Sequence, residues 1–219
     1  MRRLAILAIA ALATTGSASA DSKSKRHRVA AFSGHNAAKS SLRKEPLERP
    51  TGEVWLRAEN LGEEFKGNIY KPDGSFDDAA LAKLDELFRC TKSGEVRAVR
   101  AQLYEHMSRI YDHFGGKQVQ LVSGFRLTGE QDSSRHFHAS AMDIRVKDVS
   151  YREVYAFAET LDTGGAGAMG IGIYPTSQFV HVDFRSPGEP SFRWVDTSGH
   201  TPARKKSPGR TAPARKPVS

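Results

Sequence analysis

The sequence predicts an α+β fold, a single domain in which helices pack against a mainly antiparallel sheet. Segments with helical periodicity come early, over residues 75–90 and 96–114, whereas short strand-like segments cluster after residue 168. Runs of helices and strands that segregate along a chain are typical of this class. A chain of 219 residues with 38% hydrophobic and 26% charged residues is sufficient for one ordinary domain with appendages.

The first half of the domain is expected to contain two strands followed by two helices. Alternating apolar residues over 54–70 predict paired strands that end at the Pro72-Asp73-Gly74 turn. Ser75 is expected to cap a helix whose first turn is acidic. A second helix is expected over 96–114, because Gly115-Gly116 can end it.

The second half is expected to contain most of the sheet. A strand over 118–123 leads into a polar loop, and the capping box Ser150–Glu153 opens a third helix. The remaining strands are expected over residues 139–146, 170–174, 179–184 and 193–195. No internal repeat is visible.

The first 20 residues have the three parts of a secretory signal. Arg2 and Arg3 precede the apolar stretch 4–13, and Ala18-Ser19-Ala20 has the small-x-small pattern of a cleavage site. The alternative is a buried or amphipathic N-terminal helix. We expect an exported protein without a transmembrane span, since no later segment approaches 18 consecutive apolar residues.

The net charge of +8 comes from the ends of the chain. Residues 21–49 hold eight Lys/Arg against three acids, and residues 197–219 hold six Lys/Arg and no acid. Residues 50–196 hold 17 Lys/Arg against 22 acids, a balance of −5, so nucleic-acid binding is not expected. Both flanks have the composition of unfolded segments, which act either as solvated linkers or as tethers to an anionic envelope polymer or membrane surface.

Two stretches carry candidate metal ligands. His136 lies at the end of the polar loop and Asp143 follows in the next strand, while His181 and Asp183 share one face of a later strand. Two imidazoles and a carboxylate leave an open fourth position, as a catalytic Zn²⁺ ion requires. Spacing alone also permits hydrogen-bonded core histidines.

The order of these pieces resembles a group of zinc peptidases. Ser134, His136, Ala139, Ala141 and Asp143, followed by a distal His181, match the signature shared by D-Ala-D-Ala carboxypeptidases, VanX-like dipeptidases and lysostaphin-like enzymes. Within that group the chain is most similar to the murein endopeptidase K family, over about residues 56–194. The supporting matches are 60–63, 87–89, 93–96, 123–126, 141–145, 170–175, 179–183 and 193–194.

This resemblance implies a hedgehog/D-Ala-D-Ala-peptidase-like fold with zinc held by His136, Asp143 and His181. It implies a periplasmic enzyme that hydrolyses the peptide cross-links of peptidoglycan with a metal-activated water. The expected organisation is a signal peptide (1–20), a basic flexible linker (21–50), a zinc peptidase domain (51–196) and a basic disordered tail (197–219).

Three further residues are candidates for roles beside the metal. Arg126 is expected to bind a substrate carboxylate or the oxyanion, or else to form a structural ion pair. Asp183 is either the general base or the partner that orients His181, and the second role is favoured slightly. His138 is a base, an oxyanion donor or an ordinary loop histidine.

The chain departs from the family pattern at two positions. Ala139 replaces a glycine, so a backbone with positive φ would be strained there. Cys90 replaces an acidic residue and is expected to be partly buried, without a catalytic role. Two other functions remain open: a non-catalytic peptidoglycan-binding or scaffold protein, and a D,D- or L,D-carboxypeptidase acting on stem peptides.

Overall fold

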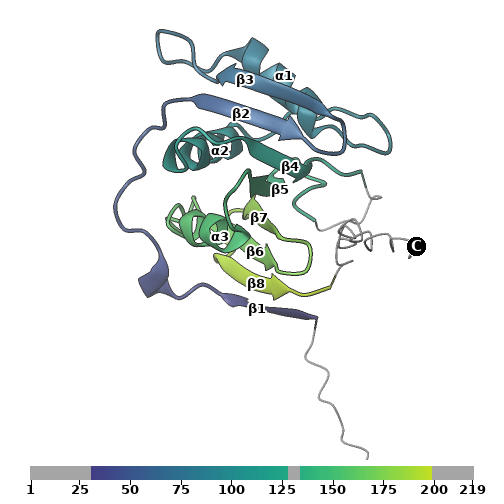
Figure 1. Ribbon diagram of the computed structural model, residues 1–219. Helices are drawn as coiled ribbons and strands as arrows, with labels where there is room; N and C mark the ends of the chain where they lie inside the picture. The colour runs from purple at the N-terminus through teal and green to yellow at the C-terminus, as the bar shows by residue number, and fades with distance from the viewer. Residues whose placement is uncertain (1–30, 128–133, 199–219) are drawn as a thin grey trace, which may run out of the picture.

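The computed structural model describes residues 31–127 and 134–198 and contains one eight-stranded sheet in the order β1-β8-β6-β7-β5-β4-β2-β3 (Figure 1). Neighbouring strands are antiparallel except for the parallel pairs β2–β4 and β6–β8. The predicted α+β class with a mainly antiparallel sheet is therefore confirmed. The strands are β1 (Phe32–Asn36), β2 (Glu53–Ala58), β3 (Glu63–Asn68), β4 (Val119–Ser123), β5 (Ala141–Val146), β6 (Met169–Tyr174), β7 (Phe179–Phe184) and β8 (Phe192–Asp196).

Three helices accompany the sheet. Helix α1 (Asp78–Phe88) contacts β3 and β2, α2 (Ala101–His113) contacts β2 and β4, and α3 (Tyr151–Glu159) contacts β5, β6 and β7. Helices α2 and α3 lie on the same side of the sheet (Figure 1). Apolar residues from the strands and helices form one hydrophobic core, including Leu56, Leu103, Ile110, Ile144, Val154, Ile171 and Val182.

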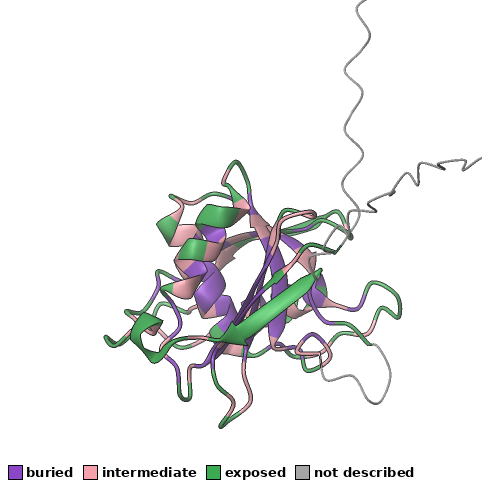
Figure 2. Ribbon diagram, turned by 90° about the horizontal axis from the view of Figure 1, so that it is seen from below, coloured by how far each residue is buried: buried purple, intermediate pink, exposed green. Residues whose placement is uncertain are grey.

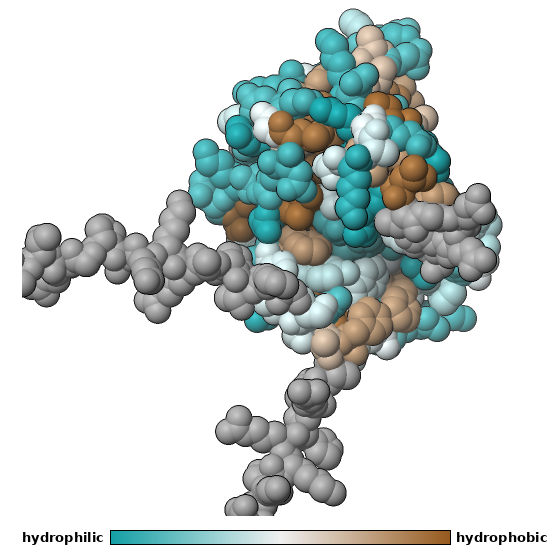
Figure 3. Space-filling view, turned by 90° about the vertical axis from the view of Figure 1, so that its right-hand side faces the viewer, coloured by the Kyte–Doolittle hydropathy of each residue, from teal (hydrophilic) through white to brown (hydrophobic). Residues whose placement is uncertain are grey.

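The candidate functional residues lie on the face of the sheet opposite the helices. Phe184 at the end of β7 packs against His106 of α2, with ring centroids 4.9 Å apart. Side chains alternate along a strand, so Asp183 and His181 point away from the helices. The side of the molecule in Figure 3 shows hydrophilic residues with hydrophobic ones in small separate groups.

Two helix starts differ from the sequence prediction. Helix α2 begins at Ala101 rather than at residue 96, because the backbone N–H of Val99 donates to Asp85 Oδ1 at 2.9 Å and holds the preceding segment out of the helix. Helix α1 is capped by Asp77 rather than Ser75: Asp77 accepts from two N–H groups of the first turn, while the Ser75 hydroxyl donates to Asp73 at 2.7 Å.

Strand β1 lies inside the span 21–50, for which the sequence predicts a flexible linker, and gives residues 32–36 of it a regular structure. It pairs antiparallel with β8 at the edge of the sheet, and all five of its residues are exposed (Figure 2). A strand that buries no side chain shows no apolar alternation, so the sequence gives no signal for it. Backbone pairing with β8 holds it in place.

The predicted signal peptide lies outside the described residues, and so does nearly all of the basic tail. Among the helices of residues 31–127 and 134–198, none is long and apolar enough to span a bilayer. The sequence-based domain limits therefore stay predictions at both ends of the chain.

Candidate metal centre

Strand register brings Asp143 and His181 together. Asp143 on β5 is the direct antiparallel partner of His181 on β7, and both side chains are buried. Directly opposite residues of an antiparallel pair have side chains on the same face and close to one another. Accordingly, His181 Nδ1 lies 2.8 Å from Asp143 Oδ1.

His136 reaches this pair from a tight turn before β5. The turn is closed by hydrogen bonds from Phe137 N to Ser134 O and from Ala139 N to His136 O. His136 Nδ1 lies 2.6 Å from the Gly124 carbonyl, which requires Nδ1 to carry the proton and leaves Nε2 with a lone pair. That Nε2 atom lies 3.2 Å from His181 Nδ1 and 3.3 Å from Asp143 Oδ1.

Ala139, which replaces the family glycine, has a positive φ of 48°. The backbone conformation expected for a glycine is thus retained, with a methyl group that costs about 1–2 kcal/mol in this region. Ala139 is itself buried in the hydrophobic core, which offsets part of this cost.

The three side chains fit a divalent metal ion. Their ligand atoms all lie within 4.8 Å of one another. Tetrahedral zinc ligands at their usual bond lengths lie about 3.3–3.6 Å apart. The two separations from His136 Nε2, 3.2 and 3.3 Å, are close to this range, and that between His181 and Asp143, 2.8 Å, is shorter. Two imidazoles and one carboxylate are the donor set of an open, catalytic type of site.

Asp183 contacts the ring nitrogen of His181 that does not face Asp143. Its Oδ2 atom lies 3.0 Å from His181 Nε2, and its Oδ1 atom accepts from Gly170 N at 3.2 Å. This arrangement places the imidazole proton on Nε2 and leaves Nδ1 available to a metal. Both carboxylate oxygens of Asp183 are occupied, so the structure favours the orienting role over that of general base.

Two glycines of β6 create the space beside His181. Gly170 pairs with Asp183 and Gly172 with His181, while Gly172 also lies opposite Trp194 of β8. A methyl group at Gly170 would overlap the Asp183 carboxylate, and one at Gly172 would overlap the Trp194 indole. The Gly-Ile-Gly sequence of β6 therefore admits two bulky groups next to one ligand.

Burial and mutual contacts set the charges of the cluster. Burial lowers the pKa of His136 and outweighs the attraction of Asp143, so His136 is neutral. Burial opposes ionisation of Asp143, but the two histidines outweigh it and lower its pKa. Burial also lowers the pKa of His181, whereas hydrogen bonds to Asp143 and Asp183 outweigh that effect and raise it.

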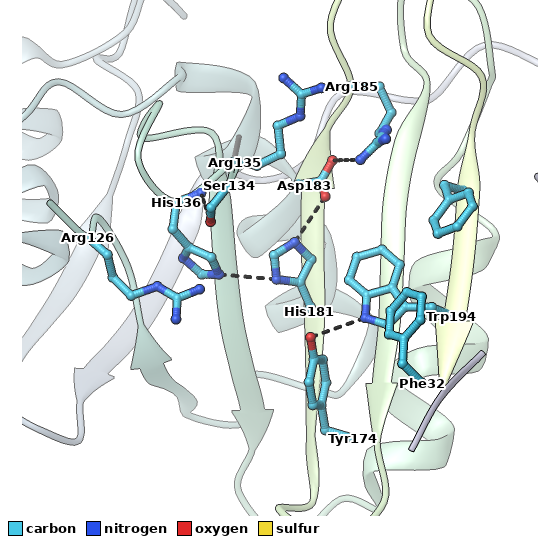
Figure 4. A pocket seen from close by; sticks show the side chains of 11 residues that line it. Phe32, Arg126, Ser134, Arg135, His136, Tyr174, His181, Asp183, Arg185 and Trp194 are labelled. Carbon is cyan, nitrogen blue, oxygen red and sulfur yellow. Dashed lines mark hydrogen bonds and ion pairs between the residues drawn. The ribbon is translucent and has the colours of Figure 1, made fainter. Parts of the chain in front are cut away.

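Two of the three candidate ligands, His136 and His181, line a pocket of about 410 Å³, the metal pocket (Figure 4). Arg126 lies on one side, and the aromatic residues Phe32, Tyr174 and Trp194 lie on the other. The Trp194 indole N–H donates to Tyr174 Oη at 3.1 Å, which fixes the two rings relative to each other. The pocket thus combines a cationic wall, an aromatic wall and, between them, two candidate metal ligands.

The structure separates the other candidates that the sequence suggested. The exposed Arg126 lines the pocket and, among the described residues, forms no ion pair, as a substrate-binding group requires. His138 is exposed and lines a neighbouring hollow instead of the metal pocket. Cys90 is fully buried within the hydrophobic core, where partial burial was expected, and it does not belong to the cluster of candidate ligands.

Sequence reasoning missed the remaining wall of the pocket. Phe32 could not be found because it belongs to the unpredicted β1, and Tyr174 and Trp194 were recognised only as parts of strands. Arg135 and Arg185 also line the pocket. Arg135 immediately precedes His136, and Arg185 lies two residues after Asp183. This closeness in sequence to the candidate site is the one feature that could have indicated them.

Comparisons with known proteins identify the family of this chain. The family described as peptidoglycan L,D-endopeptidase MepK matches residues 50–186, a span that includes all three candidate ligands. A probable peptidoglycan L,D-endopeptidase MepK from Haemophilus influenzae is 30% identical over 137 residues, covering 57% of this chain and 70% of the relative. The peptidoglycan L,D-endopeptidase MepK of Escherichia coli K12 is 28% identical over 136 residues, covering 57% and 71%. No solved structure matches. On the match to residues 50–186, this chain belongs to the MepK family of peptidases.

Proposed function

We propose that this protein is a zinc-dependent endopeptidase that hydrolyses L,D peptide cross-links of peptidoglycan in the periplasm. The observation that carries the proposal is the convergence of His136, Asp143 and His181, two of which, the histidines, line an open pocket. The names of the relatives supply the bond class and the polymer. The signal peptide expected over residues 1–20 supports export.

A zinc ion held by these ligands would lower the pKa of a bound water and polarise the scissile carbonyl. The protein contributes the geometry: Gly124 holds His136 through Nδ1, and Asp183 holds His181 through Nε2. Each contact fixes one tautomer, so neither histidine has to reorganise when it acts as a ligand.

Arg126 supplies the complementary charge. Its guanidinium lines the pocket opposite the aromatic wall (Figure 4) and offers a planar fork of hydrogen-bond donors. We propose that it donates hydrogen bonds to the oxyanion that develops on the cleaved amide, or to a carboxylate of the bound peptide. Tyr174 and Trp194 shape the opposite wall and restrict how the peptide lies over the ligands.

A digest of purified sacculi tests the proposal. The mature protein should convert cross-linked muropeptides to monomers, as measured by chromatography and mass spectrometry, and a chelator should abolish the conversion until zinc is restored. His181→Ala should lose both stoichiometric zinc and activity. His35→Ala is the control, since His35 is an exposed histidine of β1 outside the metal cluster.

Three results would contradict the proposal in different ways. Full activity of His181→Ala would rule out the proposed zinc mechanism. A wild-type protein that binds zinc and sacculi without changing the muropeptide profile would remove the enzymatic function and leave a peptidoglycan-binding protein. Products lacking only a terminal residue of the stem would identify a carboxypeptidase.

A further inference from the structure

A second hollow continues the metal pocket past its rim. Its volume is about 370 Å³, close to that of the metal pocket itself. Arg135 and Arg185 line both cavities, so the two are neighbours that meet at this pair of side chains. Ser140, just before β5, and Ser186, just after β7, also line the second hollow, which places it at the end of the β5–β7 pair.

The two shared arginines are held in place by acidic residues. Glu189 forms ion pairs with Arg135 and with Arg185, the latter at 3.4 Å, and Arg135 also donates to Ser186 Oγ at 2.7 Å. Arg185 lies 3.6 Å from Asp183 in addition. Two carboxylates, Glu189 and Asp183, therefore balance the two guanidiniums and hold their donors in fixed directions.

Arg100 adds a third cation to the lining of the second hollow. It is exposed, its guanidinium lies 4.6 Å above the Phe184 ring, and its Nε atom donates to Gln102 at 3.2 Å. Among the described residues it forms no ion pair with an acid. Its charge is therefore not neutralised by a partner and is available to a ligand.

The lining of the second hollow is basic, whereas the domain that contains it has a net negative charge. Three arginines and His138 line it, and none of the described residues that line it is acidic. Residues 50–196 as a whole hold 17 Lys/Arg against 22 Asp/Glu. A basic depression on an acidic surface attracts anions selectively, since the surrounding carboxylates repel them elsewhere.

We propose that the second hollow is an extension of the substrate groove that binds carboxylates of the peptidoglycan peptide on one side of the scissile bond, with Arg100, Arg135 and Arg185 as the binding groups. This inference rests on the proposed function. Cross-linked stem peptides carry several free carboxylates, and a peptide that lies over the metal ligands and leaves the pocket past Arg135 enters this hollow. His138, which lies outside the metal pocket, thereby gains a place beside the substrate.

Arg100→Gln gives the sharpest test, because Arg100 is exposed and lies away from the metal ligands. Arg152→Gln is the matched control: Arg152 is also an exposed arginine above an aromatic ring, 5.3 Å from the centre of Tyr151, and it lines neither cavity. The ligand is a purified monomeric muropeptide, a cleavage product that zinc-loaded enzyme binds without turnover. A second sample has its carboxylates converted to carboxamides.

We expect Arg100→Gln to raise the Kd of the native muropeptide three- to tenfold, the range of a partly exposed charged hydrogen bond. The effect should shrink when NaCl is raised from about 50 to 500 mM and should vanish with the amidated ligand. Arg100→Lys should recover most of the affinity, and Arg152→Gln should bind like the wild type.

Equal Kd values for Arg100→Gln and Arg152→Gln, in proteins with unchanged melting temperature, would overturn the inference. So would an Arg100→Gln effect that persists with the amidated ligand. A parallel sacculus digest separates this outcome from failure of the proposed function: cleavage without dependence on Arg100 removes only the groove extension, whereas Arg100-dependent binding without cleavage removes only the peptidase activity.

Discussion

The hydrogen bond between His181 Nε2 and Asp183 Oδ2 leads to a prediction about metal affinity. Asp183 is 1% exposed and uses one oxygen for His181 Nε2, at 3.0 Å, and the other for Gly170 N, at 3.2 Å. Asp183→Asn keeps the shape but offers only one acceptor. The amide NH₂ must then face either Gly170 N–H or His181 Nε2–H, so one buried donor loses its partner.

The magnitude follows from this count. A buried donor left without an acceptor costs about 1–3 kcal/mol. In the variant, His181 avoids this cost by carrying its proton on Nδ1 instead of Nε2. Nδ1 is the atom that would bind the metal, so the free-energy cost appears as weaker zinc binding. We expect zinc affinity to fall about 10- to 100-fold, equivalent to about 1.4–2.7 kcal/mol.

Competition with a chelating dye at constant pH measures this affinity. Asp162→Asn is the matched control, because Asp162 is also fully buried and bound on several sides, to Ser191, Gly164 and Arg193, but lies outside the metal cluster. It should lower stability and leave the zinc affinity of the folded protein unchanged. Wild-type zinc affinity in Asp183→Asn would refute the orienting role.

Two further predictions concern stability. Burial, with smaller contributions from Arg109 and Arg100, lowers the pKa of His106 to about 3, so the unfolded chain takes up a proton first as pH falls below about 6.5. The free energy of unfolding should drop by about 2 kcal/mol from this residue between pH 7 and 5, and denaturant titrations should show a flatter pH dependence in His106→Gln; an identical slope would contradict the shift. Gly172→Ala places a methyl group inside the Trp194 indole and should cost about 1–3 kcal/mol with a changed near-UV spectrum; wild-type stability together with an unchanged spectrum would contradict this.

Much of the sheet and the metal cluster could be predicted because their residues bury side chains in a regular pattern. The alternation of apolar residues in 170–174 and 179–184 marks β6 and β7, and the resemblance to the zinc peptidases singles out His136, Asp143 and His181 as candidate ligands. These signals are local in sequence, since each strand carries its own periodicity.

The features that escaped prediction depend on contacts between distant residues. Strand β1 is held by backbone pairing with β8, which leaves no trace in its side chains. The start of α2 is set by Asp85, which lies 14 residues before Val99. Likewise the shared role of Glu189 with Arg135 and Arg185 joins segments about 50 residues apart.

The position of β1 has a practical consequence for anyone who expresses the catalytic domain. The family match covers residues 50–186, so a fragment cut to those limits would lack both β1 and β8. It would lose Phe32 and Trp194 from the pocket and leave the backbone groups of β6 unpaired along one side. An unpaired strand of this kind is a template for aggregation. A soluble and active fragment must therefore begin before Phe32 and continue past Asp196.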